Sequence, residues 1–341
     1  MWDGLNDAVI KQFNRSEKLY VEIDKSIPRV QSYFSSCVLL PEGQMLSEIL
    51  PNDVYIRLKA YLDYLKHKIS TWVSRKQLSK GFSADKIFGS LFGNWEQKKI
   101  IWTLTQMLGL VETYIKSIEY SSLDDHLYNL AKKQEKPIGD VENVEDVCNV
   151  FNSIDRDPLL YFTKKVLELQ QDAILDISTK YRENMILEYL NGTLSSSTLY
   201  QDTGYFTQYV EDTRKVPYDS VIFEEEKKEE QNLQILTNYL KDHLLRERNK
   251  KMAEKIIHIL KTDSETSFFF AFGAGHFIGE NSIVDILKSA GFKITRFSED
   301  KLLQLKSHEV ACNPNPNAGN VIKLNCLFVF LIFHQMFAIS A

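Results

Sequence analysis

The sequence lacks several features that mark common classes of protein. Its 341 residues carry a net charge of −5 and form no basic stripe, which argues against nucleic-acid binding. No CxxC pair occurs among the four cysteines, so neither a zinc knuckle nor a thioredoxin-type site is indicated. The cysteines are Cys37, Cys148, Cys312 and Cys326. The opening residues Met1–Gly4 show no charged segment followed by an apolar one, so no signal peptide is visible.

The overall composition of the chain is that of a globular protein. Hydrophobic residues make up 44% of the chain and charged residues 26%, which are ordinary values for a protein with a substantial core. The length allows one large domain or two modest ones.

The stretch 266–297 predicts a strand, a glycine-rich turn, a helix and a second strand. Phe268–Phe272 is almost wholly apolar, as expected of a strand buried on both faces. Ile283–Leu287 repeats apolar residues at helical spacing, and Phe292–Phe297 alternates like a strand. Short units of this kind belong to parallel sheets. We therefore expect an α/β fold with a small parallel or mixed sheet, functional residues at strand ends and many surrounding helices.

The turn after the first of these strands carries a Gly-x-x-His motif, Gly273–His276. This motif places His276 at the carboxyl end of a strand, where open α/β sheets bind their ligands. An imidazole there can bind a metal ion or transfer a proton. A structural histidine in a tight turn explains the motif alone equally well, because short motifs need their structural context.

Two glutamates follow the other predicted strands. Leu19–Asp24 alternates apolar and acidic residues, so Glu22 lies on one face of a strand, where a solvated position is the ordinary explanation. Lys136–Glu142 predicts a short strand that ends at Glu142, just before a helix. An acid at a helix start also interacts favourably with the helix dipole, so the position alone assigns no function.

A long helix is predicted from Glu224 to about Lys261, and it contains Arg248 and Asn249. Acids at its start and basic residues further on suit the helix dipole. Arg248 is either an exposed helix arginine or a residue that binds a carboxylate of the site.

The C-terminal segment Val321–Ala341 is strongly apolar around Leu327–Phe333 and follows an Asn- and Pro-rich stretch. Its length is at the short end for a membrane-spanning helix. A buried core helix is the alternative, and a lipid-anchor signal at Asn317–Gly319 is a further option. The predicted organisation is a catalytic domain at 1–300, a stalk at 301–320 and a membrane segment at 321–341.

Taken together, these elements resemble the TraB/GumN family and, among its members, the TIKI metalloproteases. The elements are the Gly-x-x-His motif, Glu22, Glu142, the pair Leu123–Asp124 and the pair Arg248–Asn249. Two further segments have patterns similar to TIKI proteins: Ser36–Gln44 and Asn94–Lys98.

The resemblance implies a metal-dependent protease that cleaves the N-terminal region of Wnt proteins and lowers Wnt signalling. It implies a divalent ion, Mn²⁺ or Co²⁺, held by His276, Glu22 and Glu142. A bound ion of this kind lowers the pKa of a water molecule and polarises the scissile carbonyl. Glu22, Glu142 and Arg248 are the expected catalytic residues, and the sequence leaves open which glutamate is ligand and which is base.

The resemblance also implies a location, that of a single-pass type I membrane protein with an extracellular catalytic domain. In that compartment Cys37 and Cys148 are expected to form a disulfide. The sequons at Asn14 and Asn191 agree with glycosylation there, although such short motifs also arise by chance.

The chain departs from the family pattern at its start. The family's first Gly-x-x-His motif lies a short way upstream of the strand that carries Glu22, and the chain begins at Met1 within that interval. The sequence therefore predicts an N-terminally truncated protein with little or no activity. The alternatives are a membrane-anchored protein that binds Wnt without cleaving it, and a TraB-like hydrolase of unknown substrate.

Overall fold

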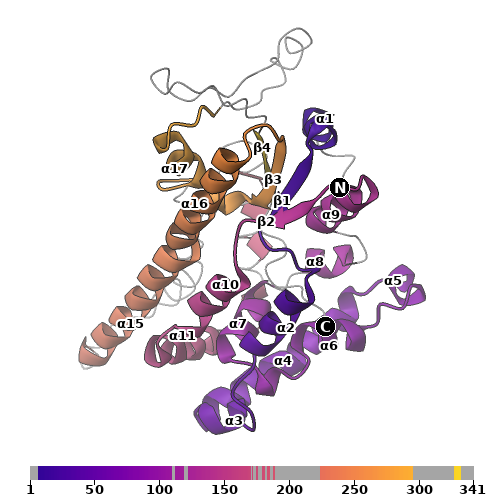
Figure 1. Ribbon diagram of the computed structural model, residues 1–341. Coiled ribbons are helices and arrows are strands. Elements are labelled where there is room, and N and C mark those ends of the chain that lie inside the picture. The colour runs from indigo at the N-terminus through magenta and orange to yellow at the C-terminus, as the bar shows by residue number, and fades with distance from the viewer. Residues whose placement is uncertain are drawn as a thin grey trace. The chain divides into compact units, whose positions relative to one another are not determined.

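The computed structural model describes residues 7–109, 112–118, 122–169, 223–294 and 326–331, with isolated residues between 171 and 188 (Figure 1). The chain divides into two compact units. The sheet unit comprises Met1–Gln31, Ser121–Asp146 and Leu244–Gln335. The helical unit comprises Ser32–Tyr120, Val147–His243 and Met336–Ala341.

The sheet unit is built on a four-stranded parallel sheet with the strand order β2-β1-β3-β4. The strands are β1 (Lys18–Val21), β2 (Ile138–Asp140), β3 (Phe268–Gly273) and β4 (Cys326–Leu331). The register pairs Leu19 with both Ile138 and Phe269. This arrangement confirms the predicted α/β class and the parallel sheet.

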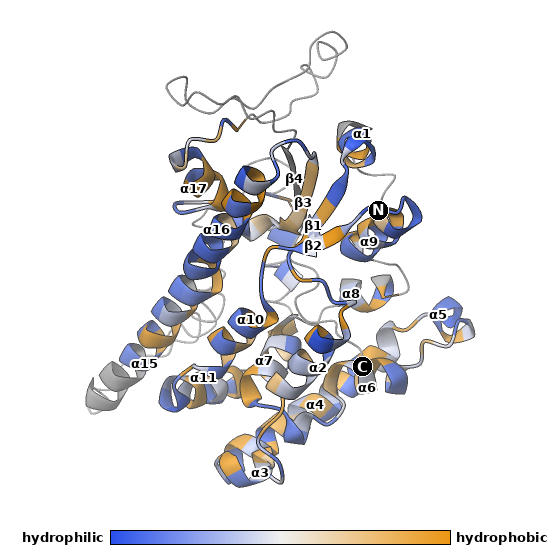
Figure 2. Cartoon of the chain, viewed as in Figure 1, coloured by the Kyte–Doolittle hydropathy of each residue, from blue (hydrophilic) through white to orange (hydrophobic). Residues whose placement is uncertain are grey.

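Strand β3 is buried on both faces, as its apolar run predicts, and none of Phe268–Phe272 is more than 1% exposed. Phe270 belongs to a core cluster with Met252 and Ile256, whereas Phe269 belongs to a second cluster with Phe13 and Leu127. Because successive side chains of a strand point to opposite faces, helices cover both sides of the sheet. Figure 2 shows the hydrophobic colour of β3 among helices of mixed hydropathy.

Four helices supply these two layers. The first face packs against α16 (Glu247–Thr262) and α17 (Ile283–Ser289), and the second against α1 (Asp7–Arg15) and α9 (Leu123–Lys133).

The helical unit is made largely of α-helices. They are α3 (Leu46–Ile49), α4 (Asn52–Trp72), α5 (Arg75–Ser79), α6 (Ala84–Phe92), α7 (Ile100–Gly109), α8 (Glu112–Ser117), α11 (Arg156–Glu168) and α15 (Phe223–Lys241). The ranges of α2 (Pro28–Cys37) and α10 (Val144–Asn152) include residues of both units. The disulfide between Cys37 and Cys148 is present, which confirms the pairing that the resemblance implies.

The structure differs from the sequence prediction after α17, where Phe292–Ile294 forms no strand. The rest of that predicted strand lies outside the described residues. Strand β3 is paired with β1 on one edge and with β4 on the other. The segment after α17 therefore cannot pair with β3 as an additional strand.

The apolar C-terminal segment also differs from the predicted membrane helix, because Cys326–Leu331 is strand β4, paired in register with β3. Its sequence CLFVFL is rich in the aromatic and β-branched residues that favour strands. None of the helices in the described parts of the chain combines the length and the apolar character that a membrane span requires. The stalk and the remaining residues of the predicted anchor lie outside the described residues.

Candidate active site

Three of the predicted site residues follow directly from the ends of neighbouring strands. Glu22 follows β1, Glu142 follows β2 by two residues, and His276 lies in the short 3₁₀ helix η5 (Ala274–Phe277) after β3. The carboxyl ends of parallel strands lie at the same edge of a sheet. The main-chain N–H of Glu142 donates to the carbonyl oxygen of Glu22 at 2.9 Å, so strand pairing continues past the strand ends and holds the two glutamates side by side.

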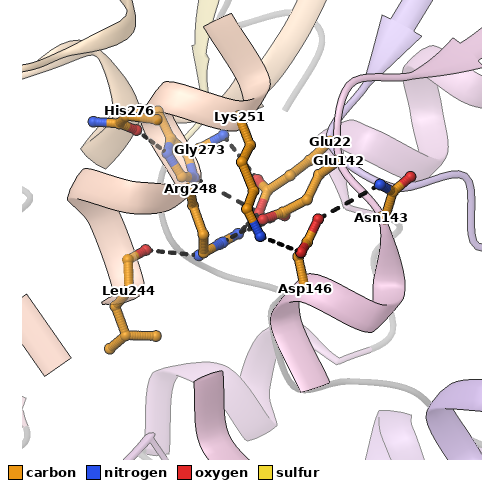
Figure 3. Close-up of polar contacts among 10 residues, drawn as sticks. Glu22, Glu142, Asn143, Asp146, Leu244, Arg248, Lys251, Gly273 and His276 are labelled. Atoms are coloured by element: carbon orange, nitrogen blue, oxygen red, sulfur yellow. Dashed lines mark hydrogen bonds and ion pairs between the residues drawn. The ribbon is translucent and has the colours of Figure 1, made fainter. Parts of the chain in front are cut away.

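Arg248 connects the two glutamates. Its Nε and Nη2 donate to the two carboxylate oxygens of Glu142, with Nη2 2.7 Å from Oε2, and Nη2 also lies 2.6 Å from Oε1 of Glu22 (Figure 3). Its Nη1 donates to the carbonyl oxygen of Leu244 at 3.0 Å. Arg248 is only 2% exposed, so the interpretation of an exposed helix arginine is wrong.

Arg248 carries its positive charge between the two glutamate side chains. Burial alone would lower the pKa of Arg248, but the charges and hydrogen bonds of Glu142 and Glu22 raise it above the ordinary arginine value. Guanidinium binds carboxylates through paired, charge-assisted hydrogen bonds. One guanidinium is shared by two glutamate side chains, so a further cation beside Glu22 would be favourable.

Glu22 faces both Arg248 and His276. Its Oε2 accepts a hydrogen bond from the main-chain N–H of Gly273 at 3.3 Å, and its Oε1 lies 3.7 Å from Nε2 of His276. Burial alone would raise the pKa of Glu22, but His276, Arg248 and the Gly273 N–H lower it well below the ordinary glutamate value. Glu22 is therefore an anion at neutral pH.

His276 is 1% exposed, and Asn249 lies against its other ring nitrogen. Nδ1 of His276 lies 2.5 Å from Oδ1 of Asn249, and Nδ2 of Asn249 donates to the carbonyl oxygen of Asn281 at 3.1 Å. The contact between Asn249 and His276 was not predicted from the sequence. The signal available in the sequence was the adjacent pair Arg248–Asn249, which resembles a pair in the family. In the structure both residues of this pair are buried on α16.

Charged residues along one face of α16 form ion pairs near the strand ends. Arg248, Lys251 and Lys255 follow one another at helical spacing, so they lie on the same side of the helix. Lys251 binds Asp146, and Lys255 binds Asp140 at the end of β2. The side of α16 that carries Arg248 therefore faces the ends of the strands.

Asp124, at the start of α9, is half-buried. Its pKa is raised to about 6, chiefly by burial and also by the negative charges of Glu22 and Asp125, while Lys25 acts in the opposite direction. Asp124 and Glu22 are therefore close enough to interact electrostatically, although no hydrogen bond joins them in the structure as described.

The residues present fit part of the predicted metal site. The 3.7 Å between Nε2 of His276 and Oε1 of Glu22 is less than twice a metal–ligand distance of ~2.1 Å, so a single ion fits between them. An imidazole and a carboxylate are suitable ligands for divalent transition metals. Glu142 is instead bound through both oxygens to Arg248. Within the described ranges, no group of three or more His, Cys, Asp or Glu side chains is placed to hold a metal ion.

The sequence matches a recognised family of proteins. Residues 2–296 match the TraB/PrgY/gumN family, and the chain is a member of that family. The resemblance to TraB/GumN proteins predicted from the sequence is thereby confirmed.

Within the curated proteins, the chain is similar to TIKI metalloproteases. It is 32% identical over 297 residues to Metalloprotease TIKI2 of Xenopus tropicalis, an alignment that covers 86% of this chain and 54% of the relative. It is also 32% identical to Metalloprotease TIKI1 of Homo sapiens, over 86% of this chain and 56% of the relative. For Metalloprotease TIKI2 of Danio rerio the identity is 31% over 320 residues, 93% of this chain and 60% of the relative. The chain thus spans little more than half the length of these relatives. No solved structure gives a significant match to it.

Proposed function

We propose that this chain is a metal-dependent peptidase of the TIKI type. The observation that carries the proposal is the pair formed by buried His276 and half-buried Glu22, whose facing nitrogen and oxygen lie 3.7 Å apart. Its similarity to proteins named metalloproteases supports the same activity.

The geometry favours different roles for the two glutamates. Glu22 is the carboxylate that faces His276, so we assign it with His276 to the ion. Glu142 receives both donors of the Arg248 fork, so its role is to hold Arg248, which in turn orients Glu22. A divalent ion such as Mn²⁺ or Co²⁺ would supply Lewis-acid activation of a water molecule and of the scissile carbonyl.

The proposed substrate is a Wnt protein, cleaved near its N-terminus, so that the chain lowers Wnt signalling. This proposal rests on the TIKI resemblance of the sequence elements. We also propose that the catalytic unit acts outside the cytoplasm, as part of a protein that is attached to a membrane. The disulfide between Cys37 and Cys148 supports an oxidising compartment, where such bonds form and persist.

The test is cleavage of a purified Wnt protein, with added Mn²⁺ or Co²⁺ and with and without a chelator, by the chain extended upstream to include the family's first Gly-x-x-His motif. We expect chelator-sensitive cleavage near the Wnt N-terminus, abolished by His276→Ala. The matched control is His67→Ala, which removes an exposed histidine of α4 and should leave cleavage unchanged. Full cleavage by the His276→Ala variant would overturn the metalloprotease proposal.

Two other results would favour the alternatives. Binding of the Wnt protein without cleavage, at saturating metal, would support a binding protein. Metal-dependent hydrolysis of unrelated peptides with an intact Wnt protein would support a TraB-like hydrolase with a different substrate.

A further inference from the structure

We infer that Asn249 is a positioning residue that holds a ring proton of His276 on Nδ1, so that the neutral ring presents the lone pair of Nε2 toward Glu22. The inference concerns the protonation geometry of the histidine in the protein as it stands. Its consequence for ion binding rests on the proposed function.

The orientation of the Asn249 amide follows from its second partner. Nδ2 of Asn249 lies 3.1 Å from the carbonyl oxygen of Asn281, and a carbonyl oxygen only accepts hydrogen bonds. The NH₂ group must therefore face Asn281, which turns Oδ1 toward His276. A flipped amide would bring two oxygens together at Asn281 and lose that bond.

The tautomer of His276 follows from the amide. Oδ1 of Asn249 is an acceptor without a proton, so the ring nitrogen 2.5 Å away must be the donor. Both residues are almost fully buried, at 2% for Asn249 and 1% for His276, so water does not compete for the bond. In the neutral ring one nitrogen is a donor and the other an acceptor, so a proton on Nδ1 leaves the lone pair on Nε2.

The carbonyl that fixes the amide is itself held by the backbone. Asn281 has a φ of 61°, in the left-handed region that asparagine adopts more readily than most residues. It directly precedes Ser282, whose hydroxyl caps the N-terminus of α17 by accepting from the N–H of Asp285. The orienting group is therefore part of a capped helix start rather than a mobile side chain.

Nε2 of His276 lies 3.7 Å from Oε1 of Glu22, and in the neutral ring with its proton on Nδ1 this nitrogen carries the lone pair. A lone pair and a carboxylate repel one another, and a cation between them removes the repulsion. Metal-bound histidines generally donate their other ring N–H to a carbonyl or carboxylate, which fixes the ring and increases its basicity. Asn249 supplies that acceptor here, so it prepares His276 for an ion without touching the ion.

The test is ¹⁵N NMR of the histidine ring nitrogens in the intact chain, at a pH of about 8–9, above the ordinary histidine pKa. The chain has 7 histidines, so the His276 signals are assigned from their loss in His276→Gln. We expect a protonated Nδ1 and an unprotonated Nε2 in the wild-type protein. A wild-type spectrum with the proton on Nε2 would overturn the inference.

Two variants of Asn249 sharpen the test. Asn249→Leu removes the acceptor, so the proton should move to Nε2, where it can donate to Glu22. Asn249→Asp retains the acceptor and should retain the proton on Nδ1. Unchanged His276 signals in Asn249→Leu would also contradict the inference.

The matched control is Asn152→Leu in the helical unit. Asn152 makes the same pair of bonds, because its Oδ1 accepts from Nε1 of Trp102 at 3.3 Å and its Nδ2 donates to the carbonyl oxygen of Cys37 at 3.1 Å. This substitution should lower stability but leave the ring signals of His276 unchanged. A shift of the proton in this control would show that the tautomer follows overall stability instead, and would overturn the inference.

Calorimetric titration with Mn²⁺ separates this inference from the proposed function. Loss of such a supporting contact generally weakens metal affinity about 10- to 100-fold, so we expect that loss in Asn249→Leu and much less in Asn249→Asp. If the NMR shows the expected proton positions but Mn²⁺ binds none of the proteins, the inference stands and the proposed metal function fails.

Discussion

Arg248 and Glu142 form a buried two-point contact in which Nε and Nη2 of the guanidinium each donate to one carboxylate oxygen. Both side chains are only 2% exposed. This contact joins α16 to the residue that follows β2, and the same Nη2 reaches Glu22 after β1. The site is therefore organised around the ion pair between Arg248 and Glu142, which a substitution of either residue removes.

Removing the guanidinium should destabilise the sheet unit strongly. Arg248→Ala leaves the buried carboxylate of Glu142 without its partner, and breaking a buried pair from one side generally costs about 3–5 kcal/mol. Arg248→Lys should also be destabilising, because an ammonium cannot reproduce the planar fork. The measurement is the free energy of unfolding in denaturant.

The matched control for these variants is Arg29→Ala. Arg29 binds Glu145 at 3.1 Å, but its side chain is 84% exposed, so its loss should change the free energy of unfolding by less than about 1 kcal/mol. If Arg29→Ala and Arg248→Ala lowered the free energy of unfolding equally, the buried contact would contribute no more to stability than the exposed one.

Two glycines next to the site should respond differently to alanine. A Cβ at Gly139 would lie 2.5 Å from Cε1 of Tyr20, whose ring stacks on Phe270, so Gly139→Ala should cost about 1–3 kcal/mol. A Cβ at Gly273 would lie 3.5 Å from Oε2 of Glu22 and 3.6 Å from Cδ2 of His276, which are ordinary contacts. Thermal unfolding of the two variants compares them, and an equal or larger loss for Gly273→Ala would contradict the packing described.

Much of this site was predictable because it depends on local sequence. The apolar run of β3 and the Gly-x-x-His motif place His276 at a strand end, and parallel pairing brings Glu22 and Glu142 to the same edge. The contacts of α16 were not predictable in the same way. Helical periodicity shows which residues share a face, but the packing of α16 on β3 decides which strand end that face meets.

The same limit explains why Phe292–Ile294, the described part of the predicted strand, forms no strand. Alternation of apolar and polar residues is a local pattern, whereas a strand also needs an unpaired edge to join. Both edges of β3 are occupied by β1 and β4, which lie far from it in sequence.

Asp124 should make the free energy of unfolding decrease as the pH rises. Its pKa is about 6 in the folded protein, above the value of about 3.9 for an unfolded aspartate. The folded state therefore holds the proton more tightly, and this contribution to stability is present below pH ~4 and lost as the pH rises through ~6.

The corresponding variant is Asp124→Asn, which cannot lose a proton. Relative to the wild-type protein, it should gain stability between pH ~4 and pH ~7, as measured by denaturant unfolding at each pH. A difference that stays constant over this range would show that Asp124 titrates normally.

Residues 321–341 offer a test of the proposed location. Attachment to a membrane through these residues predicts that deleting them, in a chain with an added signal peptide, moves the protein from the membrane fraction to the medium. A role for β4 in the sheet alone predicts instead a soluble protein before and after deletion, with a lower unfolding temperature for the shortened chain. Fractionation and thermal unfolding of the same two proteins distinguish these outcomes.

The central claim is that His276 and Glu22 bind one divalent ion, and anomalous diffraction from crystals soaked in Mn²⁺ or Co²⁺ tests it most directly. The account predicts an anomalous peak bonded to both Nε2 of His276 and Oε1 of Glu22, at ~2.0–2.2 Å from each. The peak should be absent from crystals of His276→Ala. Well-ordered wild-type crystals with no ion between these two atoms at saturating metal would contradict the account.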